Sequence, residues 1–199
     1  MVTWPGDPPV RLQSRLRIAD GQVANVSEMC LGTHTGTHVD PPYHFDDHGM
    51  KVDQLPLELL IGPAWVCEID SERDIVLPDL QGCIPQGVLR LLLKTSNSAL
   101  WHRQAQQFTP DFVALTAETA RWIPEQGVRL LGVDYLSLER PGTEDNPVHR
   151  TLLAAGVVVV EGLDLSTLRT GWYNLLCLPL KVTDGDGAPA RAVAVGPLQ

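Results

Sequence analysis

The chain has 199 residues, of which 44% are hydrophobic, so it is long enough for one substantial core and short for two. We therefore expect a single domain over residues 1–199. The formal net charge of −9 argues against a nucleic acid or an anionic membrane as the partner.

The N-terminal segment and the cysteines favour a cytoplasmic location. Residues 1–7 contain neither a basic n-region nor an apolar h-region, and no apolar run approaches the length of a membrane span. The four cysteines are scattered and form no C-x-x-C pair: Cys30, Cys67, Cys83 and Cys177. We expect buried free thiols in a reducing cytosol, and we infer neither a redox motif nor a sulfur-based metal site.

The first two predicted elements lie near the N-terminus. Apolar residues on alternate positions predict a strand over residues 10–18. Residues 34–44, with the sequence HTGTHVDPPYH, then hold three histidines and an aspartate, the densest set of metal-type ligands in the chain. His34, His38 and Asp40 are an even number of residues apart, so on an extended strand they would point to the same face.

A strand fits this segment better than a helix does. A helix could align His34 with His38 at i, i+4, but Gly36, its β-branched neighbours and the proline pair at 41–42 all disfavour helix. We predict a strand that ends at the prolines, with His44 on the loop that follows. Gly36 lies between the histidines and would leave space for an ion.

The residue types in this segment suit a metal site. Zinc and related divalent ions bind imidazole nitrogen and carboxylate oxygen, and a catalytic site keeps one position for water. The alternative is a polar surface strand with hydrogen-bonded or solvated histidines, but so many ligand types in one short stretch favour a metal. His48 lies in the acidic, glycine-ended stretch 46–49, which we interpret as a solvated turn.

The rest of the chain predicts mostly strands. Short apolar runs bounded by Gly, Pro or Asp predict strands over residues 64–69, 88–93, 128–133, 157–160, 175–182 and 190–195. One helix is predicted over residues 116–126 with Thr116 as N-cap, and another over residues 146–156 with Asn146 as N-cap and Pro147 at the first helical position. These strand–helix–strand units predict a mixed sheet in an α/β or α+β layering.

Two residues outside the motif become candidates in this layout. His149 lies in the first turn of the second helix, and Glu161 closes the strand that follows it. Either could simply be a polar residue that meets water. A two-metal centre would give both a role, because a second ion needs extra N/O ligands and a bridging carboxylate.

The segment 34–44 is similar to the H-x-G-T-H-x-D-x-P-x-H signature of the metal-dependent cyclase-type hydrolases. The resemblance extends over essentially the whole chain, through residues 4–7 (WPGD), 91–96 (LLLKTS), 131–134 (LGVD), 178–180 (LPL) and 184–192 (DGDGAPARA). It implies an α/β fold, a compact domain built around a mixed β-barrel-like core with flanking helices, of the swivelling β/β/α type. It also implies a homodimer.

The resemblance further implies a binuclear zinc site, with manganese or cobalt as possible substitutes. The implied metal ligands are His34, His38, Asp40, His149 and Glu161, with Asp40 bridging the two ions. His44 matches the family's proton donor and acceptor. Trp4 matches an aromatic residue at the substrate pocket.

Within this family the chain is similar to the arylformamidases. That similarity implies hydrolysis of N-formyl-L-kynurenine, an aryl formamide of tryptophan degradation, to L-kynurenine and formate. Another amide or lactam hydrolase of the same family, opening isatin or a cyclic imide, would use the same ligands with a different pocket. A metal-binding protein without catalysis is the third alternative, although it would have no need for a proton carrier such as His44.

Overall fold

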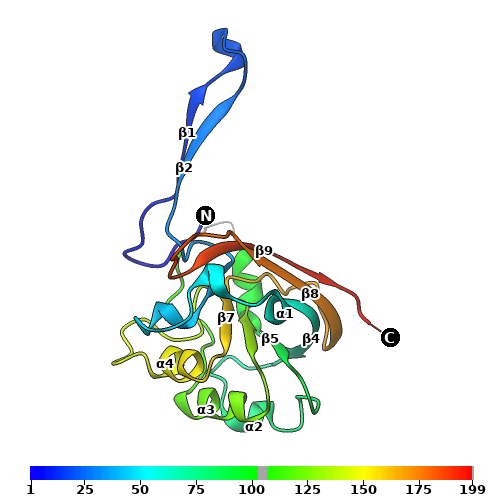
Figure 1. Ribbon diagram of the computed structural model, residues 1–199. Helices are drawn as coiled ribbons and strands as arrows, with labels where there is room; N and C mark the ends of the chain where they lie inside the picture. The colour runs from blue at the N-terminus through cyan, green and yellow to red at the C-terminus, as the bar shows by residue number, and fades with distance from the viewer. Residues whose placement is uncertain (103–106, 199) are drawn as a thin grey trace.

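Seven of the strands that the structure describes close into a barrel of mixed parallel and antiparallel pairing (Figure 1). The computed structural model describes residues 1–102 and 107–198. The order around the barrel is β3, β7, β6, β5, β4, β8 and β9, and β9 pairs back to β3. The strands are β3 (His38–Asp40), β4 (Ile61–Glu68), β5 (Arg90–Lys94), β6 (Leu130–Val133), β7 (Val158–Glu161), β8 (Gly171–Pro179) and β9 (Ala188–Val195). The predicted mixed β-barrel-like core is confirmed.

The barrel wall separates two hydrophobic clusters. The pairs β4–β5, β5–β6 and β6–β7 are parallel, and β5 to β7 are buried along their whole length, which suits their continuous Leu and Val runs. On β5, Leu92 packs into one cluster with Val66 and Val160, whereas Leu91 and Leu93 pack into the other cluster, towards the helices. This alternation follows from the two-residue period of a strand.

The two predicted helices are present as α3 (Ala117–Glu125) and α4 (Pro147–Ala154), and both lie on one side of the barrel (Figure 1). Thr116 caps α3 as predicted, because its hydroxyl accepts a hydrogen bond from Thr119 N. Asn146 stands at the N-cap of α4 but does not cap it: its backbone is left-handed, and its side chain makes no capping bond. The shorter helices are α1 (Leu57–Leu60), α2 (Leu77–Leu80) and the 3-10 turns η1 (Ile18–Asp20), η2 (Pro42–His44), η3 (Val52–Gln54) and η4 (Ser96–His102).

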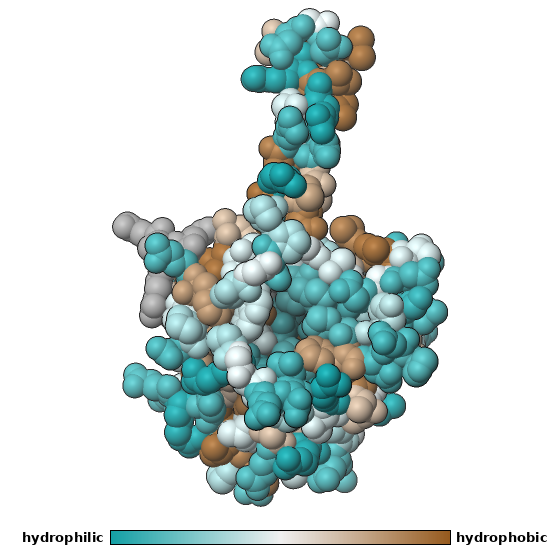
Figure 2. Space-filling model, turned by 90° about the vertical axis from the view of Figure 1, so that its left-hand side faces the viewer, coloured by the Kyte–Doolittle hydropathy of each residue, from teal (hydrophilic) through white to brown (hydrophobic). Residues whose placement is uncertain are grey.

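A two-stranded arm, residues 10–30, projects from the barrel (Figures 1 and 2). It consists of the antiparallel strands β1 (Arg11–Leu16) and β2 (Val26–Cys30), and every residue of both strands is exposed. The strand predicted at residues 10–18 is present as β1 over residues 11–16. No described residue covers its apolar side chains. Leu12 is 73% exposed and Met29 61% exposed.

The cysteine prediction is right for two residues and wrong for two. Cys67 and Cys177 are buried, whereas Cys30 on the arm and Cys83 are exposed, and all four are free thiols. Burial raises the pKa of both buried thiols to about 12, so they stay protonated and unreactive. Among the described residues, no helix is long and apolar enough to cross a membrane.

Candidate metal centre

The site is built on the pairing of β3 with β7. His38 lies opposite Glu161 in the antiparallel register, and residues paired in this way project to the same face of the sheet. Asp40 follows two residues after His38 and shares that face. Pro41 then ends the strand, as predicted, and the 3-10 turn η2 carries the chain to His44.

His34 reaches the same place from outside the strand, and the prediction of one strand over residues 34–40 is wrong at its start. The segment before His38 is a turn, in which Gly36 has a φ of +70°, a left-handed conformation that favours glycine. The turn, and not space for an ion, is what this glycine visibly serves: a Cβ there would lie 3.3 Å from the Met1 side chain, with none of the candidate ligands within 4 Å. The His34 ring packs closely against Gly187, where a Cβ would lie 2.5 Å from the ring.

The candidate ligands form two groups that share Asp40. His34, His38 and Asp40 form one group, and Asp40, His149 and Glu161 form the other, with ligand atoms in each group within 4.8 Å of one another. His34 Nδ1 lies 2.7 Å from Asp40 Oδ1, and His38 Nε2 lies 3.3 Å from the same oxygen. Glu161 places Oε2 3.4 Å from His38 Nε2 and Oε1 3.3 Å from His149 Nε2. All five implied ligands therefore meet at one place.

These residues fit a divalent metal ion. Asp40 is almost completely buried, and its Oδ2 has no hydrogen-bond partner among the described residues. An unpaired buried carboxylate oxygen is costly, and a cation beside it would remove that cost. Three imidazoles and two carboxylates without a thiolate are ligands that zinc, manganese and cobalt accept.

The buried charges of the metal-free protein pair with one another. Burial lowers the pKa of His38, but Asp40 and Glu161 outweigh burial and raise that pKa well above its ordinary value. The pKa of His149 is likewise raised to about 10, by Glu139 and Glu161 against the effect of burial. Burial raises the pKa of Asp40, yet the neighbouring histidines hold it well below its usual range. These shifts favour protonated imidazoles at the positions where a metal ion would bind.

His44 differs from these histidines. Its ring lies beside the His34 ring, with 4.0 Å between centroids, and its ring nitrogens form no hydrogen bond with any described residue. Burial lowers the pKa of His44, and the neighbouring His34 and His149 lower it further against the opposing effect of Asp40. His44 is therefore neutral near pH 7 with both nitrogens free, which is what a proton carrier requires.

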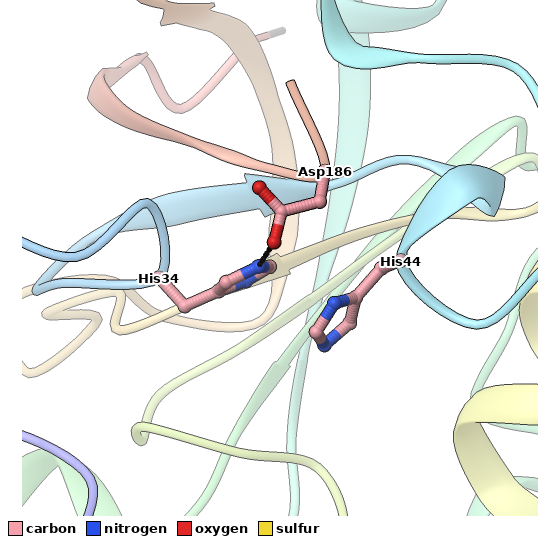
Figure 3. A group of neighbouring side chains, drawn as sticks. All are labelled: His34, His44 and Asp186. Carbon is pink, nitrogen blue, oxygen red and sulfur yellow. Dashed lines mark hydrogen bonds and ion pairs between the residues drawn. The ribbon is translucent and has the colours of Figure 1, made fainter. Parts of the chain in front are cut away.

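Asp186, which the sequence did not indicate, contacts His34 from the loop between β8 and β9. Its Oδ2 lies 3.3 Å from His34 Nε2, and Figure 3 shows the His44 ring beside the His34 ring. The ligand atoms of these three residues also lie within 4.8 Å of one another. His34 therefore turns Nδ1 towards Asp40 and Nε2 towards Asp186, so each ring nitrogen faces a carboxylate.

Glu139 is a second site residue that the sequence did not indicate. It lies in the segment between β6 and α4, and its carboxylate contacts the Nδ1 of His149 at 2.8 Å. An irregular segment gives no periodic signal for such a residue. Asp186 and Gly187 do lie in the stretch 184–192 that carries the family resemblance, but on its own an acidic, glycine-rich loop predicts only a turn.

A cavity of about 480 Å³ opens onto the metal centre. Trp4, His44 and Leu136 line it together with four of the five candidate ligands, His34, His38, His149 and Glu161. Phe108 and Phe112 hold Trp4 through edge-to-face contacts, with ring centroids 5.1 and 6.3 Å away. His48 is exposed in a turn in which its backbone N–H donates to Asp46, as expected for a residue outside the site.

Comparison with known proteins agrees with this geometry. Residues 1–140 match the model of the Cyclase family, described as "Putative cyclase". The chain is 37% identical over 194 residues to the kynurenine formamidase of Bacillus cytotoxicus, covering 97% of this chain and 90% of that protein.

Two solved structures have the same fold. A predicted metal-dependent hydrolase from Bacillus stearothermophilus superposes with a TM-score of 0.81 at 30% identity, covering 98% of this chain and 91% of that one. Isatin hydrolase A from Labrenzia aggregata superposes with a TM-score of 0.79 at 24% identity, covering 96% of this chain and 84% of that one. The family expected from residues 34–44 is confirmed, and the chain belongs to the Cyclase family.

Proposed function

We propose that the protein is a zinc-dependent kynurenine formamidase, which hydrolyses N-formyl-L-kynurenine to L-kynurenine and formate in tryptophan degradation. The similarity to a kynurenine formamidase over nearly the whole chain carries the proposal. The isatin hydrolase is less similar in sequence and supports only the shared fold, so lactam opening is the second candidate.

Two zinc ions per chain would occupy the two ligand groups. His34, His38 and Asp40 would hold one ion, and Asp40, His149 and Glu161 the other. When bound, zinc lowers the pKa of a bound water to about 7 and polarises a carbonyl as a Lewis acid. The unpaired Oδ2 of Asp40 supports a bridging role for this carboxylate.

His44 would carry the proton of the reaction. As water attacks the formyl carbon, a ring nitrogen of His44 accepts a proton, and it then donates that proton to the amide nitrogen as the C–N bond breaks. The products are formate and a free aryl amine. The lowered pKa of His44 and its free nitrogens support this role, since a protonated ring could not act as the base.

Trp4 would recognise the aryl ring of the substrate. Phe108 and Phe112 fix its indole at the wall of the cavity, so little side-chain freedom remains to be lost when a ring binds. Such ring pairs contribute about 0.5–1.5 kcal/mol beyond their buried area.

The test is to assay the purified protein on N-formylkynurenine and isatin side by side, with Trp4→Ala as the variant. We expect faster turnover of N-formylkynurenine, and a loss of about 1–3 kcal/mol in kcat/KM for Trp4→Ala from lost ring burial. An aliphatic formamide, which offers no ring, should be a poor substrate for both forms. Faster opening of isatin by the wild type would contradict the formamidase assignment and leave the metal-dependent hydrolase.

We also propose that the protein is a homodimer held by the arm, residues 10–30. The arm buries none of its strand residues against the described part of its own chain, and it exposes Leu12, Val23 and Met29. Figure 2 shows hydrophobic side chains along the arm as it stands away from the barrel. An exposed apolar patch of this kind on a two-stranded ribbon, which is marginally stable in water, supports contact with a second copy.

A further inference from the structure

Glu139 is a buried carboxylate at the edge of the metal centre that lies outside both ligand groups. Its side chain is in the segment between β6 and α4, and only 3% of the residue is exposed. Oε1 accepts a hydrogen bond from Val148 N, and Oε2 accepts hydrogen bonds from His149 N and His149 Nδ1. Both carboxylate oxygens therefore accept hydrogen bonds from the first turn of α4.

These bonds replace the helix cap that Asn146 does not provide. The first N–H groups of a helix need acceptors from outside the helix, and a carboxylate at this end is also favoured by the helix dipole. Glu139 supplies those acceptors and at the same time holds the ring that the helix carries. The backbone and the side chain of His149 thus depend on one carboxylate.

The bond to Nδ1 decides which nitrogen of His149 faces the centre. In the neutral ring that a metal ion binds, Nδ1–H donated to Glu139 leaves the lone pair on Nε2, which lies 3.3 Å from Glu161 Oε1. Phe45 stacks on the same ring, with 4.9 Å between centroids, and limits its tilt. The ring is therefore held in the orientation and tautomer that a ligand to a metal ion needs.

The other two candidate metal-binding histidines are held differently. His38 Nδ1 donates to the backbone carbonyl of Gly36 at 2.8 Å, and His34 Nε2 contacts Asp186, whose side chain is 49% exposed. A buried carboxylate makes an imidazole a stronger electron donor than a neutral carbonyl or a solvated carboxylate does. Among the candidate ligands, the hydrogen bonds of Glu139 thus reach only His149, which belongs to one ligand group and not the other.

We propose that Glu139 is a positioning residue that sets the affinity of the Asp40, His149 and Glu161 group for its divalent ion, independently of the His34, His38 and Asp40 group. This inference rests on the metal centre of the proposed function. Glu139 would not contact an ion itself and would act through its hydrogen bonds to His149.

The test measures metal affinity without substrate. Wild type and Glu139→Gln are titrated with zinc chloride in competition with a chromogenic chelator, so that two classes of site are resolved. We expect Glu139→Gln to weaken one class by about 10–100-fold and to leave the other at its wild-type affinity. With cobalt in place of zinc, the visible absorption of one of the two ions should change.

Ala154→Gly is the matched control for a merely structural role. Ala154 is the exposed last residue of α4, so glycine there weakens the helix without touching Glu139 or His149, and both affinities should remain. Unchanged binding in Glu139→Gln, equal weakening of both classes, or the same selective loss in Ala154→Gly would overturn the proposal. A wild type that binds two zinc ions but hydrolyses no formamide would instead contradict the proposed function alone.

Discussion

Asp40 connects the two ligand groups because its carboxylate is held rigidly between them. Val39 beside it is fully buried, and β3 pairs with β7 on one side and with β9 on the other, so the strand cannot rotate. Oδ1 lies near His34 and His38, while Oδ2 is unpaired. Removing one partner from a buried charge network of this kind costs roughly 3–5 kcal/mol, so substitutions here should affect folding as well as metal binding.

His38→Ala and His44→Ala should separate a metal ligand from a proton carrier. His38→Ala removes a nitrogen that faces both Asp40 and Glu161, so metal and activity should be lost together. His44→Ala should retain the metal and lose about 10²–10⁴-fold in kcat, the usual contribution of general acid–base catalysis. Metal content and single-turnover rates of both variants check this. Loss of metal from His44→Ala would instead make His44 a ligand alongside His34.

Local sequence patterns predicted which segments form strands and helices. They did not predict which strands pair with each other. The proline pair correctly ended β3, and Thr116 correctly began α3. The register that places His38 opposite Glu161 arises from pairing between segments more than a hundred residues apart, which no local pattern encodes. The element layout therefore only raised Glu161 and His149 as candidates, and their role as metal ligands was implied by the resemblance.

The start of α4 shows why a correct local pattern can still give a wrong contact. Asn146 followed by Pro147 fits the preferences for the N-cap and first positions, and the helix does begin there. Its capping bonds nevertheless come from Glu139, because the fold brings a buried carboxylate to the same N–H groups. At this helix end, the contact from Glu139 takes the place of the local cap expected from Asn146.

The arm leads to a prediction about assembly. Replacing Leu12 and Met29 together with serine removes apolar surface that no described residue of the chain covers, so the proposed dimer should dissociate while the barrel stays folded. Leu57→Ser, at a residue 57% exposed on α1, is the matched control and should leave the dimer intact. Light scattering coupled to size-exclusion chromatography measures the mass. A wild-type monomer, or a double variant that is still a dimer, would contradict the proposed role of the arm.

The metal centre should decide how the free energy of unfolding of the protein depends on pH. In the metal-free protein, His149 has a pKa raised to about 10 from an ordinary value of 6.5, and the pKa of His38 is raised well above its ordinary value. A raised pKa in the folded state means that the charged histidine stabilises the fold fully below pH 6.5. That stabilisation is lost as pH rises through the folded pKa.

Bound zinc should reverse this dependence. The ion needs neutral imidazoles, so it displaces the protons, and its apparent affinity rises with pH while it stabilises only the folded protein. We expect the Tm of the chelator-treated protein to fall between pH 6.5 and about 10, and the difference in Tm between zinc-loaded and metal-free protein to widen over the same range. Differential scanning calorimetry of both forms measures this, and the comparison cancels groups that titrate equally in each. A constant difference in Tm over that range would show that zinc does not displace protons from these histidines, and the two-group metal centre would then be wrong.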